Sequence, residues 1–150
     1  MNDLNVQNEL RERIEQMYQR IWVQWFPTGV DQAEIVVVFV NQEQVDRGAD
    51  VSSYSRILNR ILISIVPGDI NLDEEDALGR WSAWRSDLIH EMLHEFQDKV
   101  MTVATPEGAE LNRSRSRVFR GPGHDDRFYS AITDRATFFN LTPLQLLNQI

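Results

Sequence analysis

The chain has 150 residues, a net charge of −8 and no cysteine. The acidic balance argues against a general binder of nucleic acids or anionic membranes, and the lack of cysteine excludes disulfides, thiol catalysis and cysteine-based zinc sites. A hydrophobic fraction of 42% indicates one folded domain over residues 1–150. The start of the chain is acidic and unlike a secretory signal, and no apolar run is long enough to cross a membrane. We therefore expect a cytoplasmic protein.

The first half of the chain predicts a helix followed by short strands. Apolar residues recur every three or four positions over 3–26, which is typical of an amphipathic helix. The β-branched run 35–40 predicts a buried strand, and the polar segment 42–50 predicts a loop. Residues 52–58 and 61–66 indicate two more strands joined by a turn at 59–60, although the same stretch is also compatible with a helix.

The second half predicts three helices. Apolar residues over 78–103 share one face of a helix, and the acidic run 73–76 before it suits a helix N-terminus. A long connection, with room for a short hairpin, runs from residue 105 to Gly123. His124 then opens a helix with Phe128 and Ile132 on one face. Thr142-Pro143 is typical of an N-cap followed by the first helical residue.

His90-Glu91-Met92-Leu93-His94 matches the H-E-x-x-H pattern of zinc hydrolases. Residues four apart on a helix lie one above the other, so both histidines can reach one metal ion. Glu91 follows the first ligand directly, which suits a carboxylate beside a metal-activated water. The alternative is a chance match on a solvated helix.

The third zinc ligand is expected from the residues that follow the motif. His124 is the chain's only other histidine, and the glycines before it allow a close approach of the backbone. Glu107 and Glu110 are the alternatives, because some zincins use a glutamate at this position. We take His90, His94 and His124 as the ligand set of one Zn²⁺ ion.

This ligand set predicts peptide hydrolysis without a covalent intermediate. Three neutral ligands leave one open position, where water becomes acidic, with a pKa of about 7. Glu91 would take its proton and pass it to the leaving amine. Carboxylates that could accept hydrogen bonds from the ligand imidazoles are Asp87, Asp98 and Asp125. Side chains that could stabilise the transition state are Tyr129, Tyr54 and Arg127.

The segment His90–Gln97, with Gly123–Phe128 downstream, resembles the SprT-like (Spartan-type) zinc metalloproteases, which are small zincins. The resemblance covers roughly residues 55–139 and implies the same base and ligands, with Phe128 as a packing aromatic. It implies an α+β, zincin-like fold with an N-terminal helix, a small three- to four-stranded sheet, the motif helix and C-terminal helices. The strand 61–66 would lie along the cleft as an edge strand that binds extended substrate. Asp125 stands where the family usually has glycine, and a zinc-ribbon tail is absent.

The function expected from these features is a zinc metallopeptidase acting on a protein or peptide substrate. One alternative is a binding protein in which zinc is structural or the fold serves to dock a partner. Another is a protease recruited to DNA-bound proteins through a basic cluster made of Arg113, Arg115, Arg117 and Arg120. The simpler interpretation of that cluster is a solvated loop or hairpin, and the overall acidity makes nucleic acid a secondary partner at most.

Overall fold

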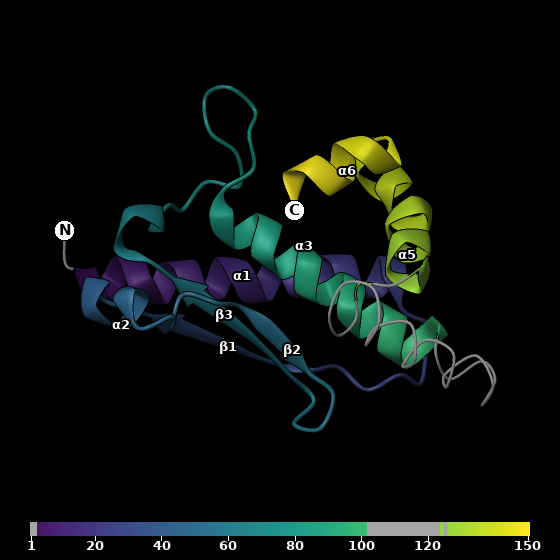
Figure 1. Cartoon of the computed structure of the whole chain (residues 1–150), viewed down its shortest axis with the longest axis horizontal. Coiled ribbons are helices and arrows are strands. Elements are labelled where there is room, and N and C mark those ends of the chain that lie inside the picture. The colour runs from purple at the N-terminus through teal and green to yellow at the C-terminus, as the bar shows by residue number, and fades with distance from the viewer. Residues whose placement is uncertain (1–2, 102–123, 125) are drawn as a thin grey trace.

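The computed structural model describes residues 3–101, 124 and 126–150, and these form an α+β fold (Figure 1). Within this part of the chain there are five α-helices and one three-stranded sheet, as the sequence predicts at the level of fold class. The elements in chain order are α1 Asp3–Trp25, β1 Glu34–Phe39, α2 Gln42–Asp46, β2 Ser53–Ser55, β3 Arg60–Ile65, the 3-10 turn η1 Pro67–Asp69, α3 Ala83–Phe96, the π-helical turn η2 Gln97–Met101, α5 Asp126–Ala136, the 3-10 turn η4 Thr137–Phe139 and α6 Pro143–Gln149.

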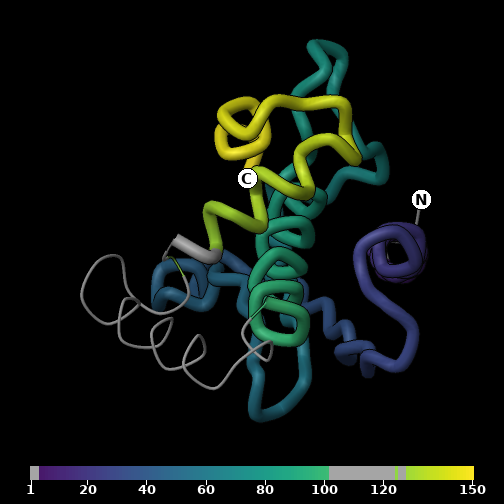
Figure 2. The backbone as a smooth tube through the Cα atoms, turned by 90° about the vertical axis from the view of Figure 1, so that its right-hand side faces the viewer, coloured from purple at the N-terminus to yellow at the C-terminus, as the bar shows by residue number. Residues whose placement is uncertain are grey.

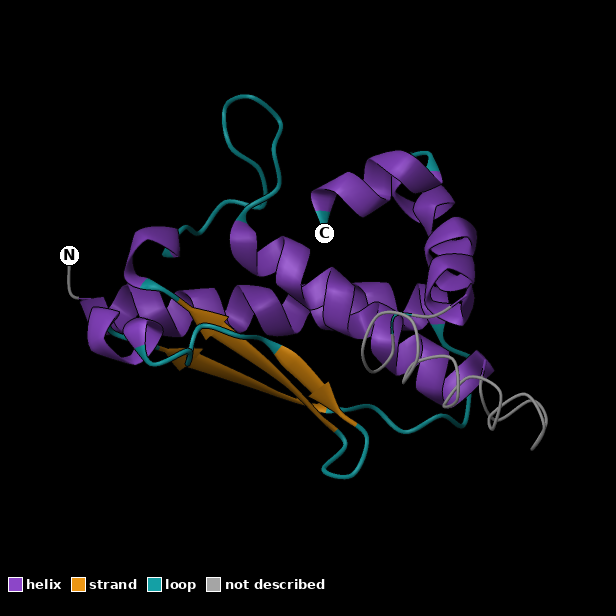
Figure 3. Ribbon diagram, viewed as in Figure 1, coloured by secondary structure: helices purple, strands orange, loops and turns teal. Residues whose placement is uncertain are grey.

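The N-terminal helix α1 confirms the amphipathic helix expected from the sequence. Its apolar stripe, which includes Leu10, Ile14 and Ile21, is completely buried. Figure 3 shows this helix lying on one face of the sheet, with the strands beneath it. Because the stripe belongs to the same core cluster as the strands and α3, α1 is the base on which the motif helix rests.

The sheet has the strand order β1-β3-β2, with β1 parallel and β2 antiparallel to β3. The expectation that the strand at 61–66 forms the edge along the cleft is therefore wrong, because both sides of β3 are paired. The physical reason is hydrophobicity: β3 supplies the buried Ile61 and Ile63, whereas β2 reads Ser-Tyr-Ser and suits a half-exposed edge. β2 is the strand at the edge that contacts α3.

Two local expectations in the first half also need correction. Residues 42–46 form the helix α2 rather than a loop, because Asn41 and Gln44 make a reciprocal capping box. The turn between β2 and β3 covers residues 56–59, so it begins three residues earlier than expected and shortens the strand predicted over 52–58 to Ser53–Ser55. Asn59 closes it with a φ of 49°, a conformation that asparagine tolerates.

The motif helix α3 is shorter than the predicted span of 78–103. It begins at Ala83 and ends at Phe96, where the chain continues as the π-helical turn η2. The acidic run 73–76 is not in its first turn, so the helix-dipole argument was wrong. Those residues belong to a projecting loop (Figure 1) that is closed by a bridge between Glu75 and Trp81 and by a hydrogen bond from the Ser82 hydroxyl to the Asp73 carbonyl.

The C-terminal half places α3 between the sheet and the helices α5 and α6. Figure 2, turned by 90°, shows α3 at the centre, with α1 to one side and the C-terminal helices above. The α5 residues Phe128, Ala131 and Ile132 join the same core cluster as α3. α6 begins at the predicted Thr142-Pro143 with a capping box. Because α5 docks on α3, the chain just before α5, which carries His124, is held against the motif helix.

None of the helices in the described residues combines the length and apolar character needed to cross a membrane. The hairpin expected between residues 105 and 123 lies outside the described residues.

Candidate metal centre

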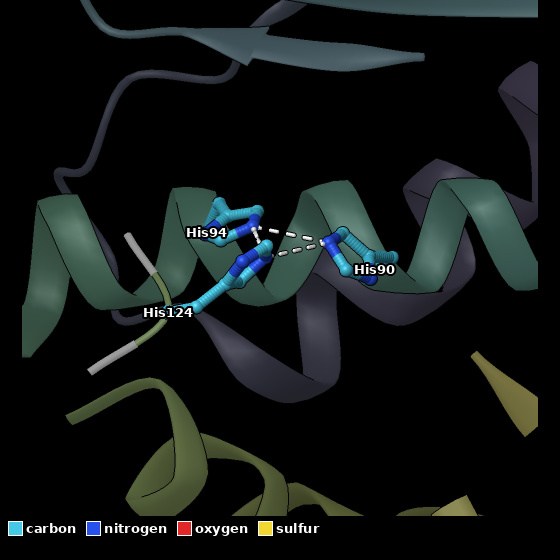
Figure 4. A group of neighbouring side chains, drawn as sticks. All are labelled: His90, His94 and His124. Atoms are coloured by element: carbon cyan, nitrogen blue, oxygen red, sulfur yellow. Dashed lines mark hydrogen bonds between the residues drawn. The ribbon is translucent and has the colours of Figure 1, made fainter. Parts of the chain in front are cut away.

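Three imidazole rings converge at the surface of α3 that faces α5 (Figure 4). The Nε2 atoms of His90 and His94 are 3.1 Å apart, and each lies 3.0–3.1 Å from the Nε2 atom of His124. His90 and His94 come from consecutive turns of one helix, and His124 reaches in from the segment before α5. Among the described residues, these three form the group able to hold a metal ion, as the sequence predicted.

Two of the rings have further hydrogen-bonding partners. His94 is hydrogen-bonded to the side chain of Gln97 and His90 to the backbone of Ile150, and both interactions raise the pKa of the histidine. In the tautomer that carries its proton on Nδ1, each ring directs its Nε2 lone pair toward the centre of the group. A cation shared by the rings would satisfy these lone pairs.

The size of the triangle also suits zinc. Tetrahedral ligands about 2.0–2.1 Å from zinc are about 3.3–3.4 Å from each other. The observed separations of 3.0–3.1 Å differ from this value by a few tenths of an ångström. The three nitrogens are therefore close to the spacing that one zinc ion requires of its ligands, and imidazole is a ligand that zinc prefers.

The ring of Phe128 packs against all three imidazole rings. Its side chain is 3% exposed, and its ring stacks on His94 with centroids 4.5 Å apart and an interplanar angle of 20°. The same ring lies 5.3 Å from the ring of His90 and 4.9 Å from that of His124. One aromatic residue of α5 thus contacts all three imidazoles, which agrees with its expected packing role.

Burial keeps the two motif histidines neutral. Desolvation, followed by repulsion from the neighbouring imidazoles, lowers the pKa of His90 to about 4 and that of His94 to about 3. The neutral form is the one that binds metal. Protons therefore compete weakly with a metal ion at this site, even at mildly acidic pH.

Glu91 is a buried carboxyl group without a hydrogen-bonding partner among the described residues. Its side chain is 5% exposed, and burial, followed by the charge of Asp87, raises its pKa to about 8. The next carboxyl group along the same face, Glu95, is equally buried but fully bonded. It accepts hydrogen bonds from the Tyr18 hydroxyl, the Ala33 N–H and the Lys99 ammonium group. Glu95 joins α1, β1 and α3, whereas Glu91 has no such structural task.

The expected supporting carboxylates lie beside β2. Asp87 accepts a hydrogen bond from the Ser52 hydroxyl and Asp98 from the Tyr54 hydroxyl. The bonds to the ligand imidazoles come instead from Gln97 and the Ile150 backbone, which sequence reasoning missed. The contact of Gln97 could have been predicted from the sequence, because Gln97 lies three residues after His94 and such residues are neighbours on a helix. The contact of Ile150 could not have been, because tertiary packing brings it there.

The remaining candidates divide into two groups. Tyr129 lines a cavity next to His90 and His124, while Tyr54 is held by Asp98 away from it. The other predicted residues lie outside the described residues, or have side chains that do: Asp125, Arg127, Glu107, Glu110, Arg113, Arg115, Arg117 and Arg120.

Comparisons with protein-family models, curated proteins and solved structures found no match to this chain. The site must therefore be interpreted from its own geometry.

The geometry predicts that each histidine contributes to metal binding. Replacing His90, His94 or His124 singly by Ala should abolish stoichiometric zinc retention after dialysis. It should also remove most of the zinc-induced rise in melting temperature, because the metal binds only the folded state. Elemental analysis and thermal denaturation with and without zinc measure both effects. An exposed loop variant, Glu75→Gln, is the control. Full zinc retention in His124→Ala would contradict the three-ligand site.

The burial of Glu91 predicts a pH-dependent cost in the metal-free protein. Between pH 4.5 and 8 the unfolded chain loses the Glu91 proton while the folded chain keeps it, so folding stability falls as the pH rises through this window. The Glu91→Gln variant has no titrating group at this position, so its folding stability should not fall in this way as the pH rises. It should match the wild type at pH 4.5 and exceed it by on the order of 3 kcal/mol at pH 8.

Urea denaturation across pH values measures this difference, with Glu12→Gln, at an exposed position of α1, as the control. Adding zinc should shrink the difference, since a nearby cation favours the carboxylate. Parallel pH profiles for wild type and Glu91→Gln would show that Glu91 is not desolvated in the folded chain.

Proposed function

We propose that this chain is a zinc-dependent endopeptidase whose ligands are His90, His94 and His124 and whose general base is Glu91. The observation that carries the proposal is the convergence of three Nε2 atoms within 3.1 Å at the helix that also carries the buried carboxyl group of Glu91. Residues that are 4 and 34 positions apart meet at this point, which a chance motif match on a solvated helix does not explain.

Two features favour a catalytic over a structural metal. Structural zinc sites are closed by four protein ligands, whereas the group in the described residues has three. A structural site also has no use for Glu91, whose burial destabilises the fold. A group that costs stability and makes no hydrogen bond within the described residues is typical of functional sites.

A bound zinc ion would make a water molecule acidic and polarise the scissile carbonyl group. Glu91 would accept a proton from that water and deliver it to the leaving amine. A raised pKa suits this exchange, because a base that must also return the proton works best near neutral pH. Phe128 would hold the imidazole rings in place, and the hydrogen bonds to Gln97 and the Ile150 backbone would favour the tautomer that leaves Nε2 free. Tyr129, beside the ligands, is our candidate donor to the substrate carbonyl oxygen.

The strand β2 supports an extended peptide as substrate. Ser52, just before β2, donates a hydrogen bond to Asp87 of α3, and Tyr54 of β2 donates one to Asp98 of η2. Asp87 lies three residues before His90 and therefore on a neighbouring position of the same helix face. β2 pairs with β3 on one side only, so its other edge is free to bind a substrate strand within the described residues. In this proposal, residues 53–55 rather than the segment 61–66 would pair with an extended substrate.

A zincin-like architecture of the SprT-like kind remains part of this proposal. It is supported by the motif helix, by the antiparallel edge strand beside it, and by a third ligand followed by the packing aromatic Phe128. The DNA-linked role of Spartan-type enzymes is not included, since the basic cluster at 113–120 lies outside the described residues.

The proposal predicts that Glu91→Gln keeps the metal but loses activity. Zinc content should equal that of the wild type, while cleavage of unfolded casein should fall at least ~100-fold, because general base catalysis contributes about 10²–10⁴-fold. A fluorescence assay of casein cleavage with the zinc-loaded protein measures the rate, with Glu75→Gln as the control. Equal cleavage by Glu91→Gln and wild type, or no cleavage by wild type, would overturn the proposed activity.

A further inference from the structure

A small cavity adjoins the three histidines on the side of the C-terminal helix. Its volume is about 160 Å³, and it is lined by His90, His124, Phe128, Tyr129, Leu147 and Ile150. Two metal ligands therefore form part of its wall. A group bound at the metal would have this cavity directly beside it.

The lining is largely apolar apart from the two histidines and Tyr129. Phe128, Leu147 and Ile150 present carbon surface, and among the described residues no carboxylate or cationic side chain lines the cavity. Leu147 is 38% exposed, so part of its side chain remains in contact with water. An apolar side chain entering the cavity would remove this surface from water, whereas a charged one would lose its hydration without a partner.

The wall formed by α6 is firmly placed. The capping box between Thr142 and Gln145 secures the start of the helix, and the buried Leu146 anchors it to the core. The backbone of Ile150 also accepts the hydrogen bond of the His90 ring, which ties the end of this segment to a metal ligand. The cavity is therefore a formed feature of the fold, and its size limits what it can hold.

We infer that this cavity is a substrate subsite that takes one medium-sized apolar side chain, such as leucine, methionine or phenylalanine, next to the scissile bond. The inference rests on the proposed peptidase function and defines its substrate class. A cavity of about 150 Å³ is large enough for benzene, so 160 Å³ accommodates an isobutyl or phenyl group. Leu147 is the residue that sets the depth of the subsite.

A series of hydroxamates tests the inference by binding rather than turnover. Hydroxamates chelate zinc, and their substituent can enter the adjoining cavity. We expect the zinc-loaded protein to bind an isobutyl or benzyl hydroxamate roughly tenfold to fiftyfold more tightly than acetohydroxamate, because the extra carbons become buried. A hydroxamate with a carboxylate-bearing substituent should show no gain. Isothermal titration calorimetry measures the dissociation constants.

Two substitutions on one helix separate the subsite from general effects. Leu147→Trp should fill the cavity and remove the preference for the larger hydroxamates while still binding acetohydroxamate. Leu144→Trp is the matched control, because Leu144 is 66% exposed on α6 and does not line the cavity. It should behave like the wild type. Mass-spectrometric mapping of cleaved casein should show apolar residues beside the cut, and smaller ones with Leu147→Trp.

The outcomes distinguish the two proposals. If acetohydroxamate binds and casein is cleaved but the substituent has no effect, the subsite inference is wrong and the peptidase proposal stands. The same conclusion follows if Leu147→Trp leaves the preference intact. If zinc-loaded protein binds no hydroxamate and cleaves nothing, the proposed function fails and the subsite fails with it.

Discussion

Three imidazole Nε2 atoms directed at one point are a constraint that the surrounding structure must satisfy. The Nε2 atoms of His90 and His94 lie 3.1 Å apart, and each lies 3.0–3.1 Å from that of His124. Such an arrangement persists only where packing holds the rings in place. Here α5 supplies that packing through Phe128, and Gln97 and the Ile150 backbone are hydrogen-bonded to His94 and His90. Much of the C-terminal half of the chain therefore serves to position three nitrogens.

The two glutamates of the motif helix show how function and stability are separated. Glu91 and Glu95 lie four residues apart and are both buried, so each would cost stability if left alone. Glu95 is satisfied by Tyr18, Ala33 and Lys99 and fastens α3 to the first helix. Glu91 is buried without a hydrogen-bonding partner among the described residues, so its burial lowers the stability of the fold. The same residue type on one helix thus has a structural task at one position and a chemical task at the other.

The π-helical turn η2 connects these two tasks. It follows α3 directly and carries Gln97, which bonds to His94, and Lys99, which bonds to Glu95. A π-helical turn changes the angular position of the residues that follow it, and such turns are frequent at functional sites. In this chain, the turn lets one short segment support a metal ligand on one side and the buried ion pair on the other.

The sequence was most informative where local rules decide the structure. Periodicity placed α1, spacing paired His90 with His94, and Thr142-Pro143 located the start of α6. The central position of β3 was not fully predictable locally: its apolar residues suit a buried strand, but β1 is equally apolar and lies at an edge, so tertiary pairing decides the strand order. The prediction that the acidic run 73–76 lies at the N-terminus of the motif helix was wrong for a similar reason. The loop contacts with Trp81 and Ser82 outweigh the weak attraction between acidic side chains and a helix dipole. Ile150 and Leu147 join the site only because α6 folds back onto it.

The number of imidazoles bound to zinc tests the central claim most directly. X-ray absorption at the zinc edge of the metal-loaded protein reports the type and distance of each ligand. We predict three imidazole nitrogens at about 2.0 Å and one further light-atom ligand. A first shell with two or fewer imidazoles, or one dominated by carboxylates, would show that His124 does not join the motif histidines. The peptidase interpretation would then lose its foundation.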